Sequence, residues 1–162
     1  MLGVPTLYEA LSNNKNVKNL DLSNLKYVIC GGDSLNYNLE QKVTKYLEDH
    51  GCSAGIQQGY GMTEALAAVA SGLKEVNKRG SIGIPFPGNY VQRVEPANKK
   101  EVKPGESGEI CICGPTVMKE YLNNPEETKK TLVKHKDGKI WLHTGDIGCM
   151  DSDGFIYFKQ RL

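Results

Sequence analysis

The chain has 162 residues, enough for one ordinary domain or two small lobes with a sizeable core. With 20 Lys and Arg against 19 Asp and Glu, its net charge is +1, which argues against an electrostatic binder of nucleic acid. The first residues lack the pattern of a secretion signal, and no apolar run is long enough to span a membrane. We therefore expect a cytoplasmic protein without a membrane span.

The cysteines show no disulfide framework. Their number is odd, and two of them lie in a run that alternates like a strand. We therefore interpret the cysteines as reduced thiols. The ligand spacings that mark zinc sites are missing, and the sequence predicts no zinc site. The five residues are Cys30, Cys52, Cys111, Cys113 and Cys149.

The first part of the chain alternates between helical and extended patterns. Residues 4–11 place apolar side chains at helical spacing, and residues 25–30 form a run rich in strand formers. Apolar residues between 39 and 47 then share one helical face, and Gly51 is placed to end that helix. Residues 54–57 resume an extended pattern. Strand, helix and strand within roughly thirty residues is the size of a βαβ unit, whose strands are parallel.

A glycine-rich loop follows each strand of this unit, at residues 31–34 and 57–64. Because the carboxyl ends of parallel strands meet at one sheet edge, we expect both loops to reach the same ligand. The glycines beside Tyr60 allow a ligand to approach the backbone closely. The hydroxyl of Thr63 and the carboxylate of Glu64 suit a phosphate and a metal ion. A plain surface turn, in which Tyr60 packs and Glu64 is solvated, is the alternative.

The pattern changes near residue 80, where glycines and prolines punctuate the chain. Short strand patterns follow, which predict an antiparallel lobe. One helix interrupts them, with Asn124 as its N-cap and a helical pattern through residue 133. The sequence thus predicts an α/β fold: a parallel βαβ sheet portion over residues 1–79 and a small antiparallel β-barrel-like lobe over residues 80–162. The expected strands of this lobe are residues 90–95, 108–113, 140–143 and 155–159.

Five motifs follow one another along almost the whole chain. They are Gly59-Tyr60-Gly61-Met62-Thr63-Glu64, Gly80-Ser81-Ile82-Gly83-Ile84-Pro85 with Pro87-Gly88, Gly108-Glu109-Ile110 through Gly114-Pro115 and Tyr121, His143-Thr144-Gly145-Asp146-Ile147-Gly148, and Asp153-Gly154-Phe155 with Arg161. Their identity and order resemble the adenylate-forming (AMP-binding) superfamily, which includes acyl- and aryl-CoA synthetases, adenylation domains of peptide synthetases and luciferases. The resemblance implies a partial adenylate-forming fold.

The resemblance also implies a two-step reaction. A carboxylate attacks the α-phosphate of ATP to give an acyl-adenylate and pyrophosphate, and the thiol of CoA then takes the acyl group. Charge gathers at phosphorus during the attack, so positioning and charge stabilisation matter most. By resemblance, Thr63 and Glu64 serve this catalytic step, Thr63 by holding the α-phosphate and Glu64 by binding Mg²⁺.

The remaining nucleotide contacts are implied in the same way. Tyr60 is expected against the adenine, with the main chain of residues 32–34 on the other side of the base. Asp146 is expected to accept hydrogen bonds from the ribose hydroxyls, and Arg161 to reach the ribose or a phosphate. The full set of expected nucleotide-binding residues is Gly32, Asp33, Ser34, Gln58, Gly59, Tyr60, Gly61, Met62, Thr63, Asp146 and Arg161.

Other polar and apolar residues suggest weaker assignments. His143 lies beside Trp141 on an alternating run, which favours a packed or hydrogen-bonded structural histidine over a catalyst. His50 and His135 carry no assignment. The small apolar residues 65–70 leave room for a fatty or aryl acid, although ordinary packing explains them equally.

Two family features are not found in this sequence: the phosphate-gripping loop that ends in Pro-Lys, and the C-terminal domain with its catalytic lysine. We therefore expect the chain to be the later part of a large N-terminal domain that ends at the interdomain hinge. On this view the chain alone does not adenylate a substrate. Two alternatives stay open: an adenylation domain that loads a carrier protein, and a non-catalytic nucleotide-binding or interaction module.

Overall fold

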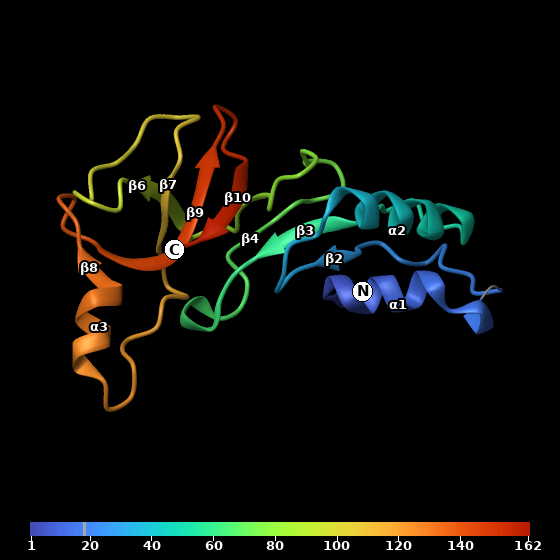
Figure 1. Ribbon diagram of the computed structural model, residues 1–162, viewed down its shortest axis with the longest axis horizontal. Coiled ribbons are helices and arrows are strands. Elements are labelled where there is room, and N and C mark those ends of the chain that lie inside the picture. The colour runs from blue at the N-terminus through green and yellow to red at the C-terminus, as the bar shows by residue number, and fades with distance from the viewer. Residues whose placement is uncertain (18) are drawn as a thin grey trace.

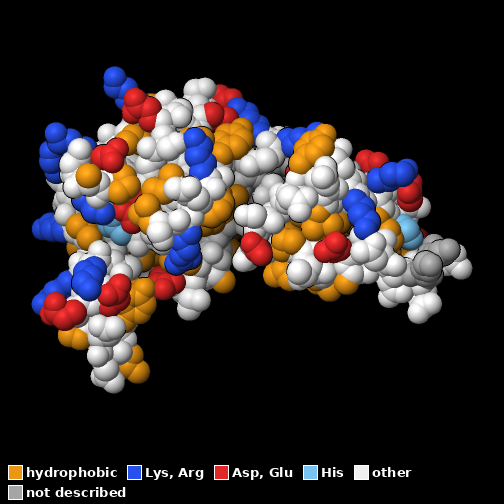
Figure 2. Space-filling model, in the orientation of Figure 1, with side chains coloured by type: hydrophobic (Ala, Val, Ile, Leu, Met, Phe, Trp, Pro, Cys, Tyr) orange, Lys and Arg blue, Asp and Glu red, His pale blue; other side chains and the backbone are white. Residues whose placement is uncertain are grey.

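Two five-stranded sheets lie side by side in the computed structural model, which describes residues 1–17 and 19–162 (Figure 1). The first sheet, with its helices, forms one end of the molecule, and the second sheet with α3 forms the other. No helix in these described ranges has the length and apolar character needed to cross a membrane. Lys and Arg side chains are interspersed with Asp and Glu side chains over the face shown in Figure 2.

The first sheet has the strand order β1-β2-β3-β4-β5. Strands β1, β2 and β3 are parallel, whereas β4 pairs antiparallel with both β3 and β5. The predicted βαβ unit is confirmed, because β2 and β3 flank α2 and pair in parallel register. The elements of this part are β1 (Leu2–Gly3), α1 (Pro5–Asn13), a 3₁₀ turn (Lys15–Val17), β2 (Ile29–Cys30), α2 (Tyr37–Asp49), β3 (Gln57–Tyr60), a second 3₁₀ turn, η2 (Thr63–Ala65), β4 (Ala70–Ser71) and β5 (Ile84–Pro85).

The two helices of this part begin and end where local chemistry dictates. Pro5 opens α1, where its missing N–H costs nothing. The side chain of Asn36 caps α2 by accepting a 2.9 Å hydrogen bond from the Leu39 backbone N–H. Gly51 follows the end of α2 with a φ of +83°, a conformation that favours glycine, so its predicted role in ending the helix is confirmed. Both helices bury apolar side chains in one core that also contains Cys30 of β2.

The strand boundaries of this part differ from those predicted. The expected strand over residues 25–30 shrinks to Ile29–Cys30, and the expected strand at 54–57 is replaced by Gln57–Tyr60. Half of the predicted ligand loop is therefore a strand. The reason is β4, which the sequence did not indicate: it pairs with Gly59 and Tyr60 and holds them in the sheet.

The second sheet is antiparallel throughout, with the order β10-β9-β7-β6 and β8 paired to β9. The antiparallel lobe and its four expected strands are confirmed. Strand β9 continues past His143 to Met150, because its second half pairs with β10. Residues 132–133, predicted as helix, instead form part of β8. The elements are β6 (Tyr90–Val94), β7 (Gly108–Cys113), α3 (Pro125–Thr131), β8 (Leu132–Lys134), β9 (Ile140–Met150) and β10 (Ile156–Arg161).

The cap predicted for α3 is present: the Asn124 side chain accepts a hydrogen bond from the Glu127 backbone N–H at 3.2 Å. This helix buries none of its residues and stands out from the sheet (Figure 1). Its stability therefore depends on its cap and its charges more than on a core.

A second core cluster joins the two parts of the chain. Ala65, Val69 and Ile82 pack there with Ile110 and other buried residues of the second sheet. The change from one sheet to the other falls between β5 and β6, a few residues beyond 80. The division into residues 1–79 and 80–162 stays a prediction.

Candidate functional site

A cavity of about 440 Å³ opens between the two sheets. It receives both the loop after β2 and the end of β3, so the glycine-rich segments do meet at one edge. Residues of β9 and β10 close its other side. The lining residues are Gly32, Asp33, Ser34, Leu35, Gln58, Gly59, Tyr60, Gly61, Gly80, Ile82, Asp146, Phe158 and Arg161.

The loop after β2 lines one side of the cavity. Gly32 has a φ of +79°, which glycine adopts without strain. The Asp33 side chain accepts a 2.7 Å hydrogen bond from the Ser34 backbone N–H, and both side chains are exposed. The turn is thus shaped by a local hydrogen bond, and its residues line the cavity.

Glycine is also required where β3 ends. A Cβ on Gly61 would lie 1.8 Å from the carbonyl oxygen of Ala67, so no side chain fits without a backbone shift. A Cβ on Gly59 would lie 3.0 Å from the Ile29 side chain, which is tighter than ordinary contact. The glycines of this segment allow the chain after β3 to turn back against itself beside the cavity.

The polar centre of the cavity is Tyr60 with Asp146 and Arg161. The Tyr60 hydroxyl donates a 2.7 Å hydrogen bond to Asp146 Oδ2, and a guanidinium nitrogen of Arg161 lies 3.7 Å from Oδ1. Burial, together with the hydrogen bond to Asp146, raises the pKa of Tyr60 well above its ordinary value, so Tyr60 stays a neutral donor. Asp146 is 5% exposed, while the Arg161 side chain is 70% exposed and can reach a ligand.

Sheet pairing produces this arrangement. Asp146 and Arg161 are direct partners in the β9–β10 register, which puts their side chains on the same face. The Asp146 backbone N–H also donates to the Thr144 hydroxyl at 3.1 Å. The carboxylate is therefore held on a rigid strand, with acceptor capacity left for a ligand.

Three residues expected at the site lie beside the cavity rather than in its lining. Thr63 and Glu64 are in the 3₁₀ turn η2 beyond β3, and Met62 packs against the second core cluster. Thr63 is exposed. Glu64 accepts a 2.8 Å hydrogen bond from the Tyr121 hydroxyl, and burial and this bond raise the pKa of Tyr121.

The cavity also contains residues to which the sequence assigned no role. Gly80 and Ile82 belong to the second motif, whose match to the family was itself a usable signal. Leu35 directly follows the first glycine loop. Phe158 lies on β10, and only the pairing of that strand with β9 brings it to the cavity.

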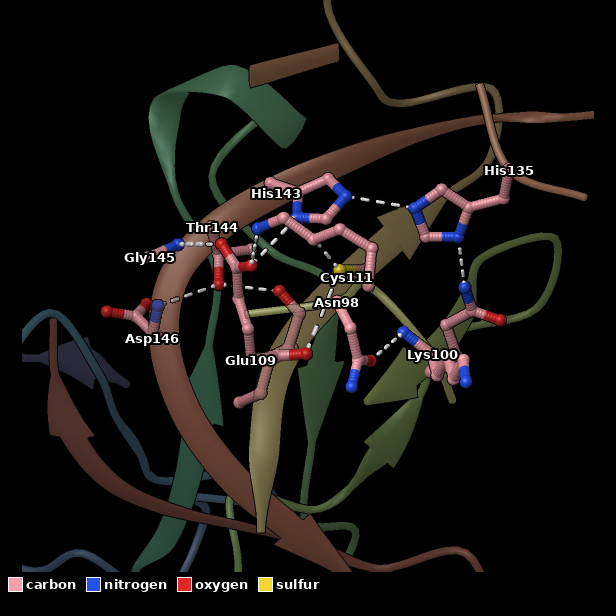
Figure 3. A network of polar contacts seen from close by, with 12 residues as sticks. Asn98, Lys100, Glu109, Cys111, His135, His143, Thr144, Gly145 and Asp146 are labelled. Carbon is pink, nitrogen blue, oxygen red and sulfur yellow. Dashed lines mark hydrogen bonds and ion pairs between the residues drawn. The ribbon is translucent and has the colours of Figure 1, made fainter. Parts of the chain in front are cut away.

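A buried polar network supports the strand that carries Asp146 (Figure 3). Glu109 accepts a 2.8 Å hydrogen bond from His143 Nδ1 and a 3.2 Å bond from the Gly145 backbone N–H. Burial tends to raise the pKa of Glu109, but hydrogen bonds from His143 and Lys99 outweigh it and lower the pKa to about 2. His143 is 8% exposed and hydrogen-bonded, so its predicted structural character is confirmed.

The cysteines are free thiols, as expected. Among the described residues, one group of three side chains could hold a metal ion: Cys111, His135 and His143, with donor atoms within 4.8 Å of one another. Sequence spacing gave no sign of it, because 24 and 8 residues separate its members.

The chain matches the family model described as AMP-binding enzyme over residues 1–122. It is 38% identical to a long-chain-fatty-acid–CoA ligase of Salmonella typhimurium over 162 residues, which are 99% of this chain and 27% of that protein. It is also 38% identical to a feruloyl-CoA synthase of an Amycolatopsis species, covering 100% of this chain and 31% of that protein.

Solved structures agree with this match. A long-chain-fatty-acid-CoA ligase from Archaeoglobus fulgidus superposes with a TM-score of 0.86 at 28% identity, over 99% of this chain and 34% of that chain. ATP-bound MatB from Rhodopseudomonas palustris gives a TM-score of 0.83 at 27% identity, over 99% of this chain and 30% of that chain. The chain thus spans about a third or less of the length of these proteins. The family model matches three quarters of this chain, the fold is a partial adenylate-forming fold, and the five motifs occur in order. The chain therefore belongs to the AMP-binding enzyme family.

Proposed function

We propose that this chain holds the AMP portion of an acyl-adenylate, as part of an ATP-dependent ligase that activates a carboxylic acid and passes it to CoA. The observation that carries the proposal is the cavity in which Tyr60, Asp146 and Arg161 meet the backbone of the loop after β2. It offers an aromatic ring, a buried carboxylate and an exposed cation around one space, and these groups suit a nucleotide.

The base and the sugar occupy different parts of this cavity. Adenine lies between the Tyr60 ring and the main chain of residues 32–34, because a flat ring fits between an aromatic side chain and an exposed backbone. The ribose hydroxyls donate to Asp146, whose Oδ1 lies 3.7 Å from the Arg161 guanidinium and keeps acceptor capacity. Arg161 then turns toward the ribose or the α-phosphate. The rest of the cavity lining around the nucleotide comes from Gln58, Gly59 and Gly61.

The phosphates extend out of the cavity toward η2. Thr63 is exposed there and can donate its hydroxyl to the α-phosphate. Glu64 can bind Mg²⁺, because this ion takes one or two carboxylates together with substrate phosphates and water. Tyr121 holds one oxygen of Glu64, which fixes the direction of the carboxylate. When bound, Mg²⁺ would offset the negative charge that builds up during the attack.

The acid is proposed to be fatty or aryl. Relatives include a long-chain-fatty-acid–CoA ligase and a feruloyl-CoA synthase, which act on one acid of each kind. Residues 65–70 favour neither, since Ala65, Val69 and Ala70 are buried in the second core cluster and their small size is explained by packing. Acceptance of CoA is likewise proposed from these relatives.

Calorimetric titration of the purified protein with AMP tests the proposal. We expect saturable binding, weakened at least about tenfold in Asp146→Asn, a loss of about 1.4 kcal/mol. Asp49→Asn is the matched control, because Asp49 is exposed at the end of α2, where it pairs with Lys45. A folded protein that gives no heat with millimolar AMP, or an Asp146→Asn variant that binds as well as the control, would overturn the proposed site.

A further inference from the structure

A second polar group, away from the nucleotide cavity, brings together one thiol and two imidazoles. Cys111 on β7 and His143 on β9 are direct partners in the strand register, and the Cys111 sulfur lies 3.6 Å from His143 Nδ1. His135 follows β8 in the hairpin that leads to β9, where its backbone N–H donates to Lys139 O at 3.0 Å. Regular sheet pairing therefore fixes the positions of all three residues.

The two rings are oriented from outside the group. Glu109 holds Nδ1 of His143 at 2.8 Å, and the side-chain amide of Gln92 contacts Nδ1 of His135. The remaining nitrogens, the two Nε2 atoms, face one another at 2.9 Å (Figure 3). Metal-binding histidines commonly donate from the outer nitrogen to a carboxylate, carbonyl or water while the inner nitrogen is directed at the ion, and His143 with Glu109 has this arrangement.

We propose that Cys111, His135 and His143 bind a divalent transition-metal ion, with Zn²⁺ as the best match. A thiolate with two imidazoles is a donor set that this borderline-soft ion prefers. With Zn–N bonds of about 2.0–2.1 Å, tetrahedral binding needs the two Nε2 atoms about 3.3 Å apart. The rings must therefore separate by a few tenths of an ångström, and the Cys111 sulfur, whose distance from the imidazole donors is within 4.8 Å, must turn toward the two Nε2 atoms. His135 is partly exposed, so water can reach the fourth position.

Binding has a defined proton balance. Cys111 is fully buried, which favours the neutral thiol over the thiolate, so the metal-free group carries an S–H bond. When the ion binds, the S–H bond breaks, a metal–sulfur bond forms and one proton leaves to solvent. His135 keeps one proton, which moves from Nε2 to Nδ1, and Gln92 turns its amide oxygen to accept it.

The surrounding charge permits an added cation. Lys99 lies 3.5 Å from His143 Nδ1 and opposes a positive ion. Glu109, whose side chain is 6% exposed and pairs with Lys99 at 3.0 Å, neutralises that charge. The thiolate formed on binding supplies a second negative charge beside the ion.

The site would fasten the β8–β9 hairpin to β7. Glu109 extends that connection to the Gly145 backbone N–H, one residue before Asp146. The ion would thus act as a structural clamp on the strand that carries the proposed ribose ligand. It would take no part in the chemistry of the nucleotide.

Co²⁺ titration of the metal-free protein tests this assignment, since a cobalt–thiolate bond gives a charge-transfer absorption band. The chain has a single tryptophan, Trp141, which stacks on His135 with ring centroids 5.5 Å apart. We expect the band to saturate at one equivalent, to rise together with quenching of Trp141 fluorescence, and to disappear when Zn²⁺ displaces Co²⁺. One proton should be released per ion in weakly buffered solution.

Matched variants separate this site from adventitious binding. Cys111→Ser and His135→Gln should abolish the band, whereas Cys113→Ser and His50→Gln should keep it, because neither residue belongs to the group. Glu109→Gln should weaken binding by about 10- to 100-fold, as expected for an outer partner. A folded wild-type protein without the band, or a band that persists in Cys111→Ser, would overturn the assignment. The wild-type result decides even if a variant fails to fold.

Discussion

The Tyr60 hydroxyl lies 2.7 Å from Asp146 Oδ2, although 86 residues separate the two along the chain. One residue ends the last parallel strand of the first sheet, and the other lies in the middle of the longest strand of the second. The bond therefore joins the two sheets at the point where the cavity opens. It also sets the direction of the carboxylate on which we propose that ribose binds.

Removing this hydroxyl tests the connection. In Tyr60→Phe the buried carboxylate loses a donor, so we expect the free energy of unfolding to fall by about 1.5–3 kcal/mol. AMP binding should weaken by about 3- to 10-fold, because Asp146 is no longer oriented while the aromatic ring remains. Urea unfolding and calorimetry measure the two effects.

Tyr157→Phe is the control for this substitution, since the Tyr157 hydroxyl makes a longer contact of 3.4 Å with Asp151. Its unfolding free energy should change by about 0.5 kcal/mol or less. If Tyr60→Phe and Tyr157→Phe lost equal amounts of unfolding free energy, the hydrogen bond to Asp146 would stabilise the fold no more than the longer contact to Asp151 does.

Gly61 supports the site through space rather than through backbone conformation. In Gly61→Ala the new methyl group meets the Ala67 carbonyl, so we expect about 3 kcal/mol of destabilisation or more and loss of AMP binding. Gly105 offers the converse case, with a φ of +84° and open space around it. Gly105→Ala should cost about 1–2 kcal/mol and leave AMP binding unchanged. Thermal unfolding and calorimetry of both variants check the contrast; Gly61→Ala with wild-type stability would contradict it.

The part of the site formed by the βαβ unit could be predicted from the sequence. A strand pattern, a helical face and a second extended pattern imply parallel strands, and parallel strands bring the following loops to one edge. Gly32 and Gly59 line the same cavity for that reason. No signal of this kind joins Tyr60 to Asp146, and only the resemblance to a family placed both at one nucleotide.

The rest could not be predicted because long-range pairing decides it. Strands β4 and β5 have two residues each, too few for any periodicity to appear. Gly145 and Asp146 are poor strand formers, so the sequence predicts a strand that ends at His143, whereas pairing with β10 extends β9 to Met150. In the same way, Cys111 and His143 become neighbours only through the β7–β9 register.

Glu64 should matter for Mg²⁺ and not for AMP. In Glu64→Gln the side-chain oxygen can still accept from Tyr121, so the fold should keep its stability while the charge for the ion is lost. We expect Mg²⁺ to strengthen ATP binding in the wild type and to have little effect in the variant, with AMP binding equal in both. Glu120→Gln provides the control, because Glu120 is exposed nearby. Calorimetry with ATP, with and without Mg²⁺, measures this, and an unchanged Mg²⁺ effect in Glu64→Gln would remove Glu64 from the proposal.

Tyr8 should make the protein sensitive to alkali. Its side chain extends from α1 and is fully buried, and its hydroxyl donates a 2.7 Å hydrogen bond to Ile29 O of β2. Burial and the nearby Cys30 raise the pKa of Tyr8 to about 12 in the folded state, against about 10 in the unfolded chain. The neutral form is thus favoured by folding. Its contribution, about 3 kcal/mol, is complete below pH 10 and is lost as pH rises toward 12.

Urea unfolding at intervals from pH 8 to pH 12 measures this loss. Tyr8→Phe cannot ionise at this position, so its unfolding free energy should start lower by about 1 kcal/mol for the missing hydrogen bond and then fall less steeply with pH. Burial raises the pKa of Cys30 to about 11, so Cys30 titrates in the same range. Part of the decrease in unfolding free energy with pH therefore remains in Tyr8→Phe. Tyr27→Phe should follow the wild type, because the Tyr27 side chain is exposed. If Tyr8→Phe and wild type fall in parallel between pH 10 and pH 12, ionisation of the buried Tyr8 is not what couples folding to pH.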